Sequence, residues 1–144
     1  MKTIEVKCYE FDELSDQAKE NALSNYQMNA EYDWGDDAIN SLKSFFNEIG
    51  LSLKDYSIDW LNPNYSKIKW DGNHNGRFVS EYFTGYGSDY SLSSSWNKNR
   101  DIDDAVWEFL IYCRDDYEYQ LSEEVYKVLC EINEYYFDEN GNLI

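Results

Sequence analysis

The sequence predicts a single α+β domain over residues 1–144, with about four helices packed on a mainly antiparallel sheet of about four to five strands. Near both ends of the chain, apolar residues recur at helical spacing, which is typical of amphipathic helices. In the middle they alternate with polar residues, which is typical of strands. Hydrophobic residues make up 42% of the chain and aromatic residues 18%, so a folded core is expected rather than a disordered acidic tail.

The first third of the chain predicts one strand followed by two helices. Residues 2–9 alternate between apolar and polar side chains and predict the strand. Ser15 is expected to cap the first helix and Asp33 the second, because short polar side chains satisfy the free N–H groups of a first helical turn. Gly50 is expected just beyond the end of the second helix. The expected apolar stripes are Leu14, Ala18, Ala22 and Tyr26 in the first helix and Trp34, Ala38, Leu42, Phe45 and Ile49 in the second.

The middle of the chain predicts strands and turns. Residues 51–60 are expected to form a strand, and residues 65–70 and 77–83 are expected to form a hairpin around the loop at 71–76. Residues 84–100 are rich in Gly, Ser, Tyr and Asn, so they predict either a mobile loop or one further edge strand.

The last third of the chain predicts two helices and a short terminal hairpin. Asp101 is expected to open the third helix and Ser122 the fourth. The dipeptide Asn140-Gly141 favours a tight turn, which would close the hairpin. The expected apolar stripes are Ile102, Val106, Phe109, Cys113 and Tyr117 in the third helix and Val125, Leu129 and Ile132 in the fourth.

The formal net charge is −17, and the acids lie in two blocks. Residues 10–37 contain nine acids and one base, residues 101–144 contain thirteen acids and two bases, and residues 38–100 have a net charge of +1. This charge disfavours direct binding to nucleic acid and to anionic membranes, because both repel carboxylates. It favours a basic protein as the partner.

The acids follow helical spacing in both blocks. In the helix expected after residue 100, they occupy about a third of the circumference, nearly opposite the apolar stripe. Neighbouring carboxylates on such a face are about 5–6 Å apart, which is comparable to the phosphate spacing along a DNA strand. An ordinary solvated helix face is the alternative. The candidate acidic partner-binding residues are Asp101, Asp104, Glu108, Asp115 and Glu118 in the second block and Asp12, Asp16 and Glu20 in the first.

Seven Trp and Tyr residues crowd the nearly neutral middle of the chain, between positions 60 and 96. Exposed aromatic side chains mark protein interfaces, and they also stack on sugars. The alternative is that these rings pack against the sheet. The candidate aromatic partner-binding residues are Trp70, Tyr86 and Trp96.

Neither a metal site nor a catalytic site is predicted. Residues 71–76 (DGNHNG) match the opening of an EF-hand calcium loop, but Tyr82 stands where that loop requires its final Glu. A hairpin loop is the favoured interpretation, and a calcium-binding module at 71–82 is the alternative. The one histidine, His74, has no nucleophile motif beside it. We therefore expect no enzyme, no catalytic residue, no metal and no cofactor.

Cysteine usage and hydropathy predict the compartment. Cys113 and Cys130 fall on apolar faces of the expected helices, so buried free thiols are expected. The sequence shows no signal peptide and no apolar run of membrane-spanning length. A reducing cytoplasm is the expected location.

The chain contains the segments FDELSDQAKENAL (11–23), YDWGDD (32–37), DDYEYQLSEE (115–124) and INEYYFDENG (132–141). Together they resemble a widespread family of small acidic proteins from bacteriophages and prophages, some of which are labelled antitoxin-like. No binding or catalytic residues are established for that family, so none carries over. The resemblance implies a phage protein acting in the cytoplasm of a host bacterial cell. In that setting, small acidic proteins often inhibit host defence, for example as DNA mimics.

Two hypotheses for function follow. In the first, the protein is a phage or prophage inhibitor whose carboxylates replace phosphates on the basic nucleic-acid-binding surface of a host defence protein, either a CRISPR effector or a restriction nuclease. In the second, it is an antitoxin-like or host-factor-binding protein that acts through the aromatic residues and displaces no nucleic acid. The first predicts binding that depends strongly on salt, and the second predicts binding that depends on salt only weakly.

Overall fold

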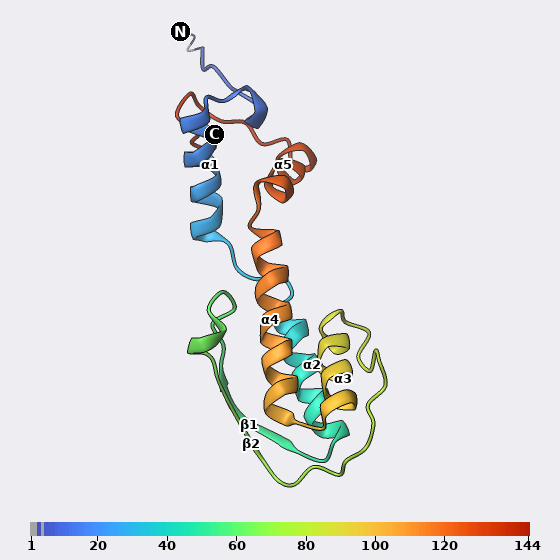
Figure 1. The fold of residues 1–144 in the computed structure, drawn as a ribbon. Coiled ribbons are helices and arrows are strands. Elements are labelled where there is room, and N and C mark those ends of the chain that lie inside the picture. The colour runs from blue at the N-terminus through green and yellow to red at the C-terminus, as the bar shows by residue number, and fades with distance from the viewer. Residues whose placement is uncertain (1–2, 4) are drawn as a thin grey trace. The chain divides into compact units, whose positions relative to one another are not determined.

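The computed structural model describes residues 3 and 5–144, and its fold is α+β (Figure 1). Within these residues the one sheet has two antiparallel strands and the helices number five, so the expected sheet of about four to five strands is wrong. The helices are α1 (Asp16–Asn29), α2 (Gly35–Glu48), α3 (Ser88–Asn99), α4 (Ile102–Gln120) and α5 (Glu123–Ile132), the strands are β1 (Ser52–Ser57) and β2 (Lys67–Asp71), and short 3₁₀ helices span Phe11–Glu13 and Pro63–Tyr65.

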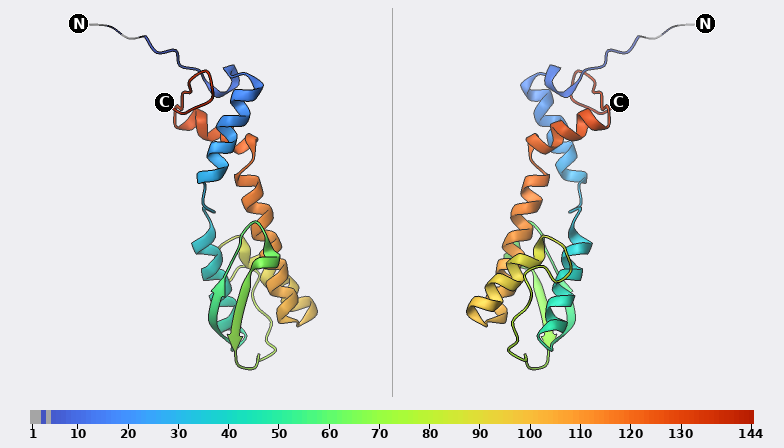
Figure 2. Two further views of the ribbon diagram at one scale, coloured as in Figure 1. Left: turned by 90° about the vertical axis from the view of Figure 1, so that its left-hand side faces the viewer. Right: turned by 90° about the vertical axis from the view of Figure 1, so that its right-hand side faces the viewer.

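The chain divides into two compact units. The terminal unit consists of Met1–Glu31 and Tyr119–Ile144 and contains α1 and α5. The central unit, Tyr32–Glu118, contains α2, the sheet, α3 and nearly all of α4. In the terminal unit α1 packs on α5, and in the central unit α2 packs on both α3 and β1 (Figure 2).

The two helices of the terminal unit begin at serine caps, as the sequence predicts. The Ser15 hydroxyl accepts a hydrogen bond from the Ala18 N–H at 3.2 Å, and the Ser122 hydroxyl accepts one from the Val125 N–H at 3.3 Å. Each bond satisfies an N–H group that the first helical turn leaves without an intrahelical partner. Both expected caps are confirmed.

The core of the terminal unit forms where α1 meets α5. The expected stripe of α1 is confirmed, with its last member, Tyr26, half-buried. The expected stripe of α5 is wrong, because Tyr126 and Cys130 form its buried face while Ile132 is 71% exposed. The buried residues of this core are Phe11, Leu14, Ala18, Ala22, Tyr126, Cys130 and Phe137.

The expected strand at residues 2–9 is wrong. Residues 3 and 5–8 have no regular structure, and residues 2 and 4 lie outside the described part of the chain. Tyr9 makes one isolated antiparallel bridge with Phe137, which bridges Leu143 in turn. Among the described residues of this segment, Tyr9 is the one that makes a β-bridge.

Gly141 lies at the tight turn expected near the chain end. Its φ of +84° is a left-handed conformation that favours glycine, and its N–H donates to the Asp138 carbonyl at 3.1 Å. A Cβ atom at this position would overlap the carbonyl oxygen of Ala18 in α1. Gly141 therefore lets the C-terminal segment approach the backbone of α1.

The two ends of α2 differ in how well the sequence predicts them. Trp34 occupies the N-cap, so the expectation that Asp33 caps this helix is wrong. Trp34 also lies outside the buried stripe, because 57% of its surface is exposed. At the other end Gly50, with φ +83°, confirms the expected termination, and the Leu51 N–H donates to the Phe46 carbonyl at 2.8 Å. The rest of the expected stripe is buried, namely Ala38, Leu42, Phe45 and Ile49.

The sheet pairs different segments from those expected. The segments 51–60 and 65–70 do contain strands, but β1 and β2 pair with each other, so the expected hairpin of 65–70 with 77–83 is wrong. Residues 77–83 form no strand. The side-chain amide of Asn97 bonds to the N–H and the carbonyl of Val79, the groups that a neighbouring strand would use. Its Oδ1 accepts from the Val79 N–H at 2.9 Å, and its Nδ2 donates to the Val79 carbonyl at 2.8 Å.

Residues 84–100 contain α3, so both the loop and the edge strand expected there are wrong. The fully buried carboxylate of Asp89 accepts from the Thr84 N–H at 2.7 Å and closes the turn before this helix. Leu92 and Trp96 lie one helical turn apart and are both fully buried. Burial of these two side chains outweighs the weak helix propensity of the surrounding Ser, Tyr and Asn residues.

The start of α4 confirms the sequence prediction. The Asp101 carboxylate accepts from the Asp104 N–H at 2.9 Å, as an N-cap residue does. The expected stripe is also confirmed, with Ile102 half-buried at its start. Its buried members are Val106, Phe109, Cys113 and Tyr117.

A candidate acidic and aromatic binding surface

The five candidate acids of α4, Asp101, Asp104, Glu108, Asp115 and Glu118, are all exposed to solvent. The structure therefore places them on the open face of the helix, opposite the buried stripe, as the helical spacing predicts. We call these five residues the acidic row.

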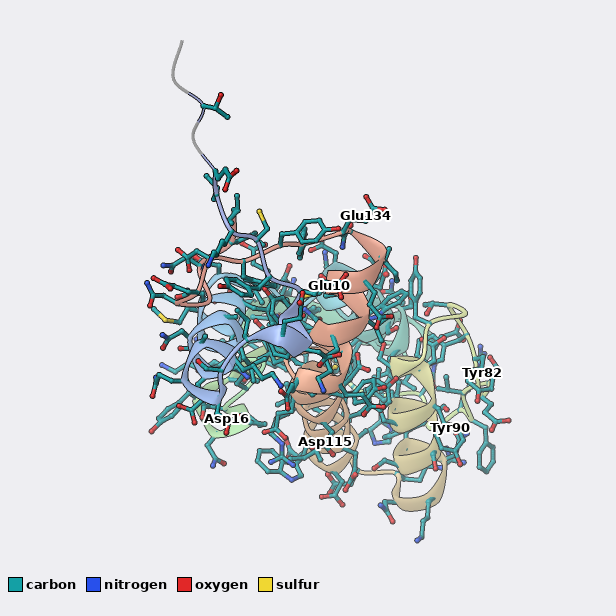
Figure 3. The ribbon with its side chains drawn as sticks, turned by 90° about the horizontal axis from the view of Figure 1, so that it is seen from above. Glu10, Asp16, Tyr82, Tyr90, Asp115 and Glu134 are labelled. Atoms are coloured by element: carbon teal, nitrogen blue, oxygen red, sulfur yellow. The ribbon has the colours of Figure 1, made fainter. Side chains whose placement is uncertain are left out.

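Few carboxylates have a basic partner, although the chain has 29 acids. Across residues 3 and 5–144, three ion pairs join Lys54 to Asp71, Arg114 to Asp115 and Lys127 to Asp12. Within the acidic row only Asp115, which is labelled in Figure 3, belongs to one of these three ion pairs. The distance between Arg114 Nη2 and Asp115 Oδ1 is 2.9 Å. The remaining charge of the row is balanced by no ion pair within the described residues.

The candidate acids of the first block, Asp12, Asp16 and Glu20, belong to the terminal unit and are also exposed. Asp12 lies in the 3₁₀ helix before the Ser15 cap, so the expectation that all three share one helical row is wrong. The Asp12 carboxylate lies 3.4 Å from Lys127 Nζ, which partly neutralises it.

The three candidate aromatic residues have different environments. Trp96 is fully buried, and its indole N–H donates to the Arg77 carbonyl at 2.8 Å, so its expected role in partner contact is wrong. Trp70 is half-buried and stacks on Phe46 with 5.4 Å between ring centroids. Tyr86 is half-buried and lines a cleft. Sequence reasoning missed the burial of Trp96 because it missed α3.

Several exposed aromatic residues of the central unit were not among the three candidates named from the sequence. Tyr82 and Tyr90, the latter in α3, are 62% and 49% exposed and stack on each other, with 6.2 Å between their ring centroids (Figure 3). Trp107 in α4 is 42% exposed, beside Glu108 in the sequence. The only sequence signal for Trp107 is its helical position, which places it off the apolar stripe.

A cleft of about 270 Å³ lies at the start of α2, the start of α3 and the middle of α4. It contains four aromatic rings and two carboxylates, and no Lys or Arg lines it. We call it the tyrosine cleft, and all of its lining residues belong to the central unit. They are Tyr32, Trp34, Asp37, Ala38, Tyr86, Gly87, Ser88, Tyr112 and Asp116.

Tyr32 connects the wall of the tyrosine cleft to the core. Its hydroxyl donates to Asp116 Oδ2 at 2.6 Å, and its ring stacks on Tyr117 at 5.2 Å. Burial, and then the hydrogen bond to Asp116, raise the pKa of Tyr32. Burial, and then the charge of Asp116, also raise the pKa of Tyr112. Both phenols therefore stay protonated at neutral pH, and the formal charge of the cleft comes from its two aspartates.

A buried polar network fixes the turn that carries Tyr86. The Asp89 carboxylate accepts from the N–H of Gly85 at 2.9 Å in addition to its bond with Thr84. The Ser88 hydroxyl donates to the Ser41 hydroxyl of α2 at 2.8 Å. Because fully satisfied buried networks rigidify their surroundings, this part of the cleft wall is preorganised.

Other candidate chemistry has a structural explanation. Cys113 and Cys130 are buried free thiols, as expected, and burial raises the pKa of Cys113 to about 12, so it carries no thiolate at neutral pH. In the 71–76 loop the Asn75 side chain donates to the Glu48 carbonyl at 3.1 Å and attaches the loop to α2. Throughout the described chain no group of three His, Cys, Asp or Glu side chains is arranged to hold a metal ion. Over the same residues, every helix is too short or too polar to cross a lipid bilayer.

Comparison of the chain with protein-family models, with curated proteins and with solved structures gives no match. The resemblance to small acidic phage proteins therefore stays a prediction from the four sequence segments.

Proposed function

We propose that the protein is a non-enzymatic inhibitor, encoded by a phage or prophage, that binds the basic nucleic-acid-binding surface of a host defence protein. A CRISPR effector or a restriction nuclease is the proposed target, with carboxylates of the acidic row in place of phosphates. The observation that carries this proposal is that the acidic row is solvent-exposed and mostly without basic partners. The phage setting comes from the sequence resemblance.

The physical argument concerns uncompensated charge. At a net charge of −17 the carboxylates of the chain repel one another. The three ion pairs of the described residues relieve little of this repulsion. A basic partner surface supplies the missing positive charge. Such complementarity accelerates encounter and makes association strongly dependent on ionic strength. A surface evolved to bind DNA already presents Lys and Arg side chains at phosphate spacing.

The test is a charge-neutralised variant of the acidic row. Asp101→Asn, Asp104→Asn, Glu108→Gln, Asp115→Asn and Glu118→Gln remove five charges, and Asn at position 101 keeps a good helix cap. In DNA-cleavage assays with a panel of purified CRISPR effectors and restriction nucleases, we expect the target to be inhibited at least about tenfold more weakly by this variant.

The matched control removes the same number of charges elsewhere. The exposed residues Glu5, Glu31, Glu48, Glu134 and Glu139 are changed to Gln. We expect this control to inhibit within about twofold of wild type, because these residues lie outside the row. Equal loss in both variants would attribute inhibition to net charge alone, and full inhibition by the row variant would contradict the proposal.

The second candidate function is an antitoxin-like or host-factor contact through the aromatic surface. The observation that favours it is the exposure of Tyr82 and Tyr90 together with half-buried Trp70 and Tyr86 in the same unit. It predicts that Tyr82→Ala with Tyr90→Ala weakens partner capture more than neutralising the acidic row does. It also predicts a complex that survives about 0.5 M salt, where the Debye length falls well below 10 Å.

A further inference from the structure

We propose that the tyrosine cleft is a receptor for one arginine side chain of the basic partner, with the guanidinium held between aromatic rings and the carboxylates of Asp37 and Asp116. This inference rests on the proposed function, because it assumes a basic protein partner. It adds a specific anchor to an otherwise diffuse attraction between charged surfaces.

The chemistry of the cleft matches an organic cation. The rings of Tyr32, Trp34, Tyr86 and Tyr112 line it, and aromatic faces attract a cation within about 6 Å of their centroid. Arginine is favoured over lysine because a guanidinium is planar, weakly hydrated and able to bond a carboxylate through two N–H groups. No Lys or Arg lines the cleft, so no cationic side chain is present there to pair with a phosphate or carboxylate.

The size of the cleft argues for a single side chain. Its volume of about 270 Å³ lies just below the range of about 300–1,000 Å³ that is usual for sites of drug-sized ligands. The cleft is therefore small for a drug-sized ligand. A side-chain head group that enters from a larger docked surface suits it better.

The helix ends at the cleft do not reverse its charge. α2 and α3 both begin there, and each helix N-terminus contributes about half a positive charge. Together they supply about one positive charge, against two negative charges from Asp37 and Asp116 and a third from Asp89 in the first turn of α3. The balance stays negative, which favours a cation.

The carboxylate of Asp116 is preorganised for this role. Its Oδ2 accepts the bond from the Tyr32 hydroxyl at 2.6 Å, which fixes the carboxylate on the cleft wall. A carboxylate has about four acceptor positions, so this one bond leaves capacity for a guanidinium. The buried bonds of Asp89 fix the turn that carries Tyr86, another residue of the cleft lining.

The central unit already pairs arginine with an aromatic ring. The guanidinium carbon of Arg100 lies 3.5 Å from the centroid of the exposed Phe78 ring. This contact forms on an open surface, where the cation keeps much of its hydration. A cleft with several rings and two carboxylates offers a guanidinium more contacts of both kinds.

The experiment is a titration of the full ¹⁵N-labelled protein with N-acetyl-arginine methylamide, followed by amide and indole NMR shifts. The matched control probe is the citrulline analogue, which has the same shape but no charge. We expect the arginine probe to shift the Trp34 indole N–H and the Gly87 and Ser88 amides with millimolar affinity, and the citrulline probe to shift them at least about fivefold less. Equal shifts from both probes, equal binding of the lysine analogue, or no shift at about 50 mM would overturn the proposal.

Two variants localise the site. Asp116→Asn removes the charge but keeps an acceptor for Tyr32, and Tyr86→Leu removes a half-buried ring. We expect each to weaken arginine binding at least about fivefold, whereas Glu108→Gln, outside the cleft lining, leaves it unchanged. The amide spectrum of each free variant shows whether it is folded. Unchanged binding by folded Asp116→Asn and Tyr86→Leu would overturn the assignment to this cleft.

The failure of each proposal gives a different pattern. If the arginine probe does not bind while the acidic-row variant loses inhibition, the cleft proposal fails and the proposed function stands. If the probe binds at the cleft while the acidic-row variant inhibits like wild type, the proposed function fails and the cleft is still confirmed as an arginine site.

Discussion

The terminal and central units use similar residues in different ways. Both contain exposed carboxylates and many aromatic rings. In the terminal unit Tyr126 stacks on Tyr26 at 4.4 Å and packs edge-on against Phe11 at 5.7 Å, so these rings form a small core. In the central unit larger buried side chains such as Phe109 and Trp96 form the core, and other rings remain at the surface around a cleft.

The acids of both units are sparsely compensated, because two of the three ion pairs found in the described residues lie in the central unit and one lies in the terminal unit. In the terminal unit Asp12 is paired with Lys127. In the central unit four members of the acidic row belong to none of the ion pairs found in the described residues. Composition is therefore a poor guide to function in a chain this acidic.

The largest expected effect on stability comes from a substitution in the core of the central unit. Phe109→Ala removes a fully buried ring of α4 and should lower the free energy of unfolding by about 3–5 kcal/mol. Trp107→Ala on the same helix is the control and should cost about 1 kcal/mol or less, because this side chain is 42% exposed. Urea unfolding followed by circular dichroism measures both. Similar losses of unfolding free energy in both variants would show that the buried Phe109 contributes no more to stability than the exposed Trp107.

A smaller effect should be confined to the terminal unit. Gly141→Ala places a methyl group against the Ala18 carbonyl in a left-handed conformation and should cost about 2–4 kcal/mol. The control is Gly76→Ala, with φ +72° and no atom within 4 Å of the new Cβ, which should cost about 1 kcal/mol. Hydrogen exchange should accelerate at the Ala22 amide of α1 in the first variant, while the Phe45 amide of α2 stays protected. Equal acceleration at both amides would show that the two units unfold together.

The smallest effect is a pH dependence in the terminal unit. The N–H of Asn142 donates to the Asp138 carboxylate at 2.9 Å and, with the N–H of Asn140, holds the pKa of Asp138 below its ordinary value of 3.8. Because the folded state lowers this pKa, the charged carboxylate stabilises the fold above pH 3.8, and this contribution is lost as the pH falls through the lower, folded-state pKa. Asp138→Asn should lower the melting temperature slightly at neutral pH, and the gap from wild type should close in acid. A constant gap at all pH values would contradict this linkage.

Local signals in the sequence predicted the helices that begin with a capping residue and an apolar stripe. Ser15, Asp101 and Ser122 each cap the helix expected at that position, and Gly50 ends α2 as expected. These features depend on residues within one or two helical turns. The exposure of the acidic row follows from the same periodicity, since it lies opposite the stripe of α4.

The interpretation of the middle of the chain was wrong where side chains distant in sequence decide the structure. The sequence of residues 77–83 predicts a strand. The backbone N–H and carbonyl of Val79, however, bond to the side-chain amide of Asn97, 18 positions further along the chain, and not to a neighbouring strand. α3 has a Ser-rich sequence that does not indicate a helix, and it forms because Leu92 and Trp96 are buried in the central unit. Trp96 thus belongs to the core instead of an interface.

The sequence by itself determined the charge, the caps and the buried stripes of most helices, because these depend on composition and on neighbours three or four positions away. Only the tertiary structure decided the number of strands, the helix at 88–99 and the tyrosine cleft. The cleft depends on the bond between Tyr32 and Asp116, 84 positions apart, and on that between Ser41 and Ser88, 47 positions apart. Such hydrogen bonds stabilise the fold only when the whole unit excludes water, so no local sequence pattern predicts them.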